Sequence, residues 1–173
     1  LGIFLAALLT FSGMQHNVRA EENSKTGEET LALNVSPYLP ESVDFGGEKI
    51  PLDVYWVREN LDRELTIASY HHSTTILSIK RAARFFPTIE KILAEEGLPD
   101  DFKYLCVAES NLQNVVSPAK ASGFWQFLES TAKIYGLEVN SEVDERYHLE
   151  KATRAACRYL QDSKNRLGSW ALA

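Results

Sequence analysis

The chain has 173 residues, of which 45% are hydrophobic and 24% charged, so it can form one main domain with appendages. Its net charge is −6, and it contains no dense run of basic residues. These features exclude nucleic acid as an expected partner, because surfaces that bind nucleic acid need clustered positive charge.

The N-terminal stretch is apolar. Residues 1–11 are almost entirely hydrophobic, and residues 18–20 have the small-x-small pattern that a signal peptidase cleaves. The apolar run is shorter than the roughly 20 residues that cross a bilayer as a helix. We interpret residues 1–20 as a signal peptide with a truncated start, since the chain begins at Leu1; a buried helix is the alternative. The protein is then exported, to the periplasm or the cell envelope.

The next segment lacks a regular period. Residues 21–36 are rich in Glu, Ser and Thr. Residues 37–53 contain three prolines and the pair Gly46-Gly47, which favour extended and irregular backbone. We therefore expect a disordered or irregular linker over residues 21–50.

Helical periodicity begins after this linker. A first apolar stripe runs from Val54 to Ala68, with charged residues on the opposite face. A second helix is expected to end at Phe86. A third is expected to begin at Pro87, because a proline's missing N–H costs nothing in a first turn. Residues 51–96 are thus predicted to form a helical lead-in.

Residues 97–173 are predicted to hold three more helices. The first begins at Pro99, where two aspartates complement the helix dipole, and continues past Glu109. A short helix stops at Gly136, and a longer amphipathic one stops at Gly168, since glycine readily ends helices. The predicted fold class is mainly α.

Glu109 lies on the apolar face of its predicted helix. Phe102, Leu105, Cys106 and Leu112 share its stripe at helical spacing. A carboxyl group that loses water has a raised pKa and can hold a proton near neutral pH, as a glycosidase acid must. The alternative is a glutamate paired with a neighbouring Arg, Tyr or Ser.

Neither a metal nor a cofactor is expected. Cys106 and Cys157 lie in predicted helices among apolar neighbours, which favours buried thiols, although an exported protein allows a disulfide. No Cys or His spacing resembles a zinc site. The scattered histidines are His16, His71, His72 and His148.

An ordered set of motifs surrounds Glu109. It consists of Glu109-Ser110, an S-P-x-x-x-S-G-x-x-Q element over residues 117–126, Y-G-L over residues 135–137, and the helix "DERYHLEKATRAACRYL". This set resembles the lytic transglycosylases with a soluble-transglycosylase catalytic domain, and is most similar to the group of membrane-bound lytic murein transglycosylase D. The resemblance implies a lysozyme-like helical domain over residues 97–173, preceded by the helical lead-in.

The resemblance also implies the site. Glu109 is the sole catalytic acid and base, and five residues bind or orient the substrate: Ser117, Ser122, Gly123, Trp125 and Gln126. Trp125 can equally be a core residue. Two positions depart from the family pattern: Lys120 replaces a usual glycine, and Glu129 a frequent proline. The family's Ala-Tyr-Asn motif is expected to follow "SWALA".

The implied activity is cleavage of the bond between N-acetylmuramic acid and N-acetylglucosamine in peptidoglycan, giving 1,6-anhydromuramic acid ends without consuming water. Substrate assistance makes a second carboxylate unnecessary. The acidic residues Glu142, Asp144, Glu145 and Glu150 are better explained by helix starts and solvated surface. Glycan strands are the expected partner of a monomer that associates peripherally with the envelope. A lysozyme-like hydrolase and a non-catalytic wall-binding module are the alternatives.

Overall fold

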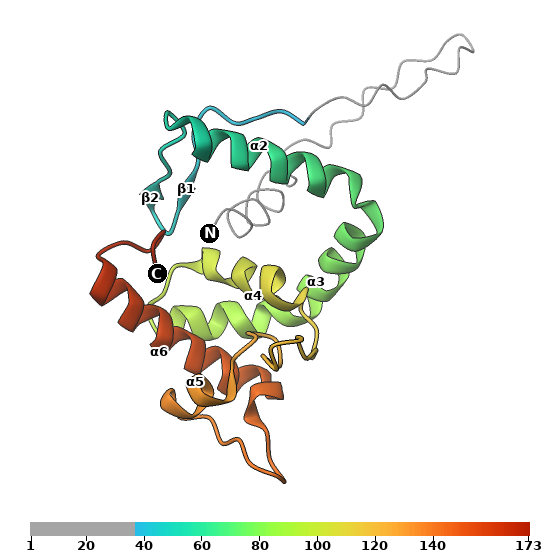
Figure 1. Ribbon diagram of the computed structural model, residues 1–173, viewed down its shortest axis with the longest axis vertical. Helices are drawn as coiled ribbons and strands as arrows, with labels where there is room; N and C mark the ends of the chain where they lie inside the picture. The colour runs from blue at the N-terminus through green and yellow to red at the C-terminus, as the bar shows by residue number, and fades with distance from the viewer. Residues whose placement is uncertain (1–36) are drawn as a thin grey trace, which may run out of the picture.

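The computed structural model describes residues 37–173 and confirms a mainly helical fold (Figure 1). The longest helices in this range are α2 (Tyr55–Tyr70), α3 (His72–Glu95) and α6 (Leu149–Leu167). The predicted signal peptide and the first part of the predicted linker lie outside the described residues. Within them, no helix is both long enough and apolar enough to cross a membrane.

A small antiparallel hairpin occupies the end of the segment that was expected to be irregular. Strands β1 (Asp44–Phe45) and β2 (Glu48–Lys49) are joined by Gly46-Gly47, and both glycines have positive φ angles. Residues 37–43 have no regular structure. The hairpin forms because Phe45 is buried and packs its ring edge-on against Phe102.

The lead-in forms two helices rather than three. Helix α3 continues through Pro87, where a helix start was predicted. A proline inside a helix removes one backbone hydrogen bond. Here the buried face continues on both sides of it, from Ala82 and Phe86 to Ile89 and Leu93, so packing keeps the helix intact.

The core lies where α3 and α6 pack against each other, with α4 (Lys103–Ser110) against α3. Figure 1 shows α4 between α2 and the C-terminal half of α3. Cys106 on α4 and Cys157 on α6 are both buried and free, as the apolar surroundings predicted. A 3-10 turn, η1 (Asp100–Phe102), leads into α4 and replaces the first turn of the predicted helix.

Two short elements connect α4 to α6. Helix α5 (Glu129–Ile134) ends just before Gly136, and the 3-10 turn η2 (Glu145–Tyr147) precedes α6. Helix α6 ends at Gly168, whose φ of 77° is the left-handed conformation that the sequence indicated there. The loop between α4 and α5 carries most of the predicted site residues.

Candidate active site

Glu109 lies in the last turn of α4, and the backbone turns sharply after it. Asn111 and Leu112 have φ angles of 52° and 55°, and the N–H of Asn111 donates to the carbonyl of Val107. Asparagine enters the left-handed region more readily than most residues, so it can end a helix as glycine does. No further helical turn follows to cover the Glu109 side chain.

The Glu109 side chain is half-buried and lines a cleft of about 640 Å³. Burial raises the pKa of Glu109 above the ordinary value of 4.5, because lost hydration penalises the charged form. No lysine or arginine among the described residues forms a salt bridge with it. A carboxyl group in these surroundings retains its proton to a higher pH, as a general acid requires.

The cleft walls are mostly apolar and come from distant parts of the chain. Among the described lining residues, Glu109 is the only side chain of the Asp, Glu, His, Lys or Arg type. The apolar lining includes Trp56, Leu61, Leu105, Phe127, Leu160 and Trp170. Helix α2 and the hairpin therefore complete a cleft whose acid comes from α4.

Ser110 ties the helix that carries Glu109 to the loop below it. Its hydroxyl donates to the carbonyl oxygen of Phe124 at 2.8 Å, and the thiol of Cys106 approaches the same oxygen at 3.3 Å. Both side chains are buried, so these bonds are protected from competition with water. They fix the position of residues 122–127 relative to α4.

Ser117 organises the loop rather than facing the cleft. Its hydroxyl accepts the N–H of Ala121, and its carbonyl accepts the N–H of Lys120, which closes a tight turn. Lys120 has a φ of 64°, a left-handed conformation that favours glycine. The glycine that the family pattern has at this position therefore matches the backbone of the turn.

Gln126 brings the loop to the Glu109 cleft, and Gly123 holds Gln126 in place. Gln126 lines the same cleft, and its Nε2 donates to the carbonyls of Gly123 at 2.8 Å and Val115 at 3.0 Å. Gly123 has a φ of 80°, and a Cβ there would lie 1.9 Å from the carbonyl oxygen of Arg146. Only glycine fits this position without moving the backbone of Arg146.

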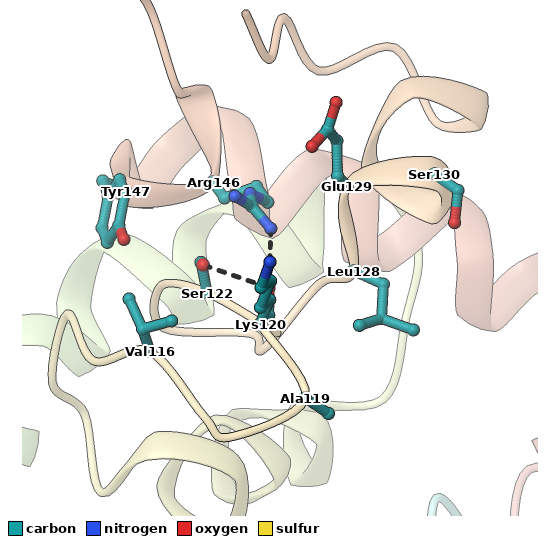
Figure 2. Close-up of a pocket in the computed structure, with 9 residues that line it drawn as sticks. All are labelled: Val116, Ala119, Lys120, Ser122, Leu128, Glu129, Ser130, Arg146 and Tyr147. Carbon is teal, nitrogen blue, oxygen red and sulfur yellow. Dashed lines mark hydrogen bonds between the residues drawn. The ribbon is translucent and has the colours of Figure 1, made fainter. Parts of the chain in front are cut away.

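Arg146 is a buried clamp on the same loop. Its Nη1 donates to the carbonyls of Lys120 and Phe127, both at 3.1 Å, and its Nη2 forms a salt bridge with Asp144 at 2.7 Å. Figure 2 shows Arg146 and Ser122 converging on Lys120 in a second hollow, of about 590 Å³. Arg146 thus supports the loop from outside the Glu109 cleft.

Two other predicted residues are largely buried. Trp125 is 7% exposed, and its Nε1 donates to Thr153 Oγ1 at 2.9 Å, so most of the ring is packed although part of it borders the cleft. Ser122 is buried and pairs its backbone with Val116 and Phe127 in short β-bridges. These buried contacts indicate that Trp125 and Ser122 hold the backbone of the site in place.

The acidic residues after α5 lie outside the cleft, as their positions predicted. The guanidinium of Arg146, by hydrogen bonding, lowers the pKa of Asp144. Glu145 accepts the backbone N–H of Glu138 and pairs with Lys151, and these bonds lower its pKa. Within residues 37–173, no group of three potential metal-binding side chains comes together.

Residues 86–173, just over half of the chain, match the transglycosylase SLT domain family. The chain belongs to this family. The matched region of this SLT domain begins inside α3, upstream of the boundary expected at residue 97. It contains Glu109, the loop and Arg146, whereas α2 and the hairpin precede it.

Two curated relatives are named membrane-bound lytic murein transglycosylase D. They come from Escherichia coli K12 and from Escherichia coli O6:H1 strain CFT073, and each is 29% identical to the SLT protein over 118 residues. The match covers 67% of this chain and 25% of each relative, so the chain spans about a quarter of their length. No solved structure matches the chain significantly.

Sequence reasoning missed three contributors to the site of this SLT domain. Arg146 belongs to the motif "DERYHLEKATRAACRYL", but its buried hydrogen bond to Lys120 joins residues that are distant in sequence, so the motif alone does not predict it. Ser110 was assigned only as part of a motif. One feature of the sequence could have indicated the cleft wall from α2: Trp56 is a large apolar residue on the polar face of an amphipathic helix.

Proposed function

We propose that this protein is a lytic transglycosylase that cleaves the glycan strands of peptidoglycan, with Glu109 as the catalytic acid and base. The observation that carries the proposal is the environment of Glu109, a half-buried carboxyl group in a large apolar cleft, with no ion-pair partner among residues 37–173. The family membership and the names of the two E. coli relatives support the same activity.

The reaction begins with protonated Glu109. It donates its proton to the oxygen between C1 of N-acetylmuramic acid and N-acetylglucosamine as that C–O bond breaks. The substrate's acetamido oxygen stabilises the developing positive charge at C1. The Glu109 carboxylate then takes the proton of the muramyl C6 hydroxyl, and O6 attacks C1. The products are a 1,6-anhydro ring and a free N-acetylglucosamine hydroxyl, with no water consumed.

The lining of the cleft favours this route over a two-carboxylate mechanism. A second catalytic carboxyl group lies about 5–5.5 Å from the acid in retaining glycosidases, and about 6.5–9.5 Å in inverting ones. Among the described residues that line the cleft, Glu109 is the only carboxylate side chain. This lining supports a mechanism in which Glu109 both gives and takes the proton.

The other site residues position the acid and the sugar in this proposal. Both side-chain hydrogen bonds of Gln126 among the described residues use Nε2, so its Oε1 serves as the acceptor for a substrate hydroxyl or amide. Gly123 leaves room for the carbonyl of Arg146, and its own carbonyl accepts the Gln126 amide, so it positions Gln126 for the sugar. Ser117, Ser122 and Trp125 hold the loop in shape, with the edge of Trp125 bordering the substrate.

We also propose a division of labour along the chain. Residues 97–173 supply the acid and its loop, and residues 51–96 supply a wall of the cleft through α2 and Trp56. The apolar start of the chain and the "membrane-bound" relatives support action in the cell envelope. The protein acts there as a monomer that associates peripherally with the envelope and its glycan.

Mass spectrometry of digested peptidoglycan tests the proposal. The full-length protein is expected to release muropeptides with 1,6-anhydromuramic acid ends, and the Glu109→Gln variant to release none above background. Glu150→Gln is a matched control, because Glu150 is exposed and does not line the cleft. Reducing muramic acid ends would show a hydrolase, and glycan binding without lysis by the wild type would show a wall-binding module. Either result overturns the proposal.

A further inference from the structure

Helix α2 places a tryptophan in the cleft that contains Glu109. Trp56, Val57 and Asn60 all line this cleft, and all precede the region that matches the SLT family. Figure 1 shows α2 on the other side of α4 from the C-terminal half of α3. The wall that α2 builds is thus a feature of the lead-in.

The core does not account for the position of Trp56. Its side chain is 63% exposed, whereas Leu61 and Leu65 on the same helix are buried and anchor it. The other tryptophans have structural contacts: Trp125 donates to Thr153, and Trp170 packs its ring against Phe102. Because Trp56 continues the apolar lining of the cleft, the two form one contiguous exposed apolar surface, which is typical of a binding site.

We propose that Trp56 forms a sugar-stacking subsite, where the indole face packs against the C–H face of one pyranose ring of the glycan strand. This inference rests on the proposed function, because the occupant is the polymer whose bond Glu109 cleaves. Trp56 and Glu109 line the same cleft, so a glycan strand bound at Glu109 can extend over Trp56.

Asn60 completes the subsite. It lies four residues after Trp56, so both side chains project from the same face of α2. Its amide has one acceptor and two donor hydrogens, which can bind an N-acetyl group or a ring hydroxyl beside the stacked face. An amphipathic sugar needs this combination of a flat apolar surface and an adjacent amide.

The subsite is expected to act on binding rather than on the chemical step. An interaction made equally in the ground state and the transition state changes KM and leaves kcat unchanged. Loss of one aromatic contact is worth about three- to tenfold in affinity. Trp56→Ala should therefore raise KM by about three- to tenfold, and Trp56→Phe should restore part of the loss.

The test uses the full-length protein with soluble, peptide-free glycan strands and with purified sacculi. Tyr55→Ala is the matched control, because Tyr55 is the preceding aromatic residue, is 76% exposed and does not line the cleft. Steady-state kinetics give KM and kcat. Co-sedimentation of Glu109→Gln with sacculi, with and without Trp56→Ala, measures binding independently of turnover.

Weaker binding and a raised KM for Trp56→Ala, with Tyr55→Ala unchanged, support the subsite. Unchanged KM and sedimentation overturn it, even if wild-type turnover confirms the proposed function. A fall in the melting temperature of Trp56→Ala as large as that of Leu61→Ala also overturns it, because the ring would then be structural. The two proposals can also fail separately. If the wild-type protein shows no turnover but its binding to sacculi depends on Trp56, the subsite is supported and the proposed function is overturned.

Discussion

Gly123 and Arg146 approach each other so closely that a Cβ on Gly123 would lie 1.9 Å from the carbonyl oxygen of Arg146. The same arginine donates its guanidinium hydrogens to the carbonyls of Lys120 and Phe127, on either side of Gly123. Arg146, which precedes α6, therefore holds this loop from one side, while Ser110 and Cys106 of α4 hold it through the carbonyl of Phe124. The geometry of the candidate site depends on these contacts.

Gly123→Ala should destabilise the protein by more than about 3 kcal/mol, because the methyl group collides with backbone that cannot move without breaking the Arg146 clamp. Gly47→Ala is the control, since Gly47 has a similar φ of 75° but nothing within 4 Å of the added Cβ. It should cost only about 1–2 kcal/mol of backbone strain. Urea unfolding of both variants measures the difference, and equal losses would show that the close approach is unimportant.

Lys120→Gly should stabilise the protein by about 0.5–1 kcal/mol. Glycine removes the strain energy of the left-handed backbone at residue 120, and this gain exceeds the free-energy cost of the greater conformational entropy that glycine gives the unfolded chain. Lys133→Gly is the comparison. It puts glycine into helix α5 and removes a salt bridge with Glu129, so it should destabilise by about 1 kcal/mol. A loss of stability in Lys120→Gly, measured by the same unfolding experiment, would contradict the turn geometry.

Glu48 should make stability depend on acid pH. Its carboxylate accepts hydrogen bonds from Lys164, Ser169 and the N–H of Trp170, which lower its pKa from 4.5 to about 2. This contribution is complete above the unfolded-state pKa and is lost as the pH falls from about 4.5 to about 2. Glu48→Gln should melt below wild type at pH 7, and the gap should close over that window. A gap that does not change with pH would exclude the carboxylate's charge as the cause.

Glu109→Gln should raise the melting temperature at pH 7, although the proposed mechanism predicts that it abolishes turnover. Because the folded-state pKa of Glu109 is raised, its contribution to stability falls as the pH rises above the unfolded-state value. A neutral amide avoids this cost, whereas below about pH 4 the carboxyl group is protonated in both states and the advantage disappears. Melting curves of the wild type and Glu109→Gln at pH 7 and below about pH 4 check this. A variant that is less stable than the wild type at pH 7 would contradict the burial of the Glu109 carboxyl group.

Local features of the sequence predicted much of the fold. The stop of α6 at Gly168, the short α5 before Gly136 and the buried thiol of Cys106 all follow from backbone freedom and apolar spacing, and the structure confirms them. The prediction that one helix ends at Phe86 and another begins at Pro87 was wrong. The apolar face on both sides of it outweighs the lost hydrogen bond, and a rule about single residues does not include that packing.

The candidate site was only partly predictable, because several of its contacts join residues that are distant in sequence. Helical spacing gave the apolar environment of Glu109, and the structure agrees. The hairpin's contact with Phe102, the arginine clamp and the wall from α2 depend on the three-dimensional arrangement of these elements. No periodicity within one segment indicates that Trp56 and Glu109 share a cleft.

The pKa of Glu109, measured by ¹³C NMR of its side-chain carboxyl with Glu109→Gln to assign the signal, tests the central claim most directly. We predict a midpoint above the ordinary glutamate value of 4.5 in the ligand-free protein, because the side chain is half-buried with no cationic partner in the described part of the chain, and burial disfavours the carboxylate. A midpoint at or below 4.5 would show a hydrated or ion-paired carboxylate and would contradict Glu109 as the acid of this cleft.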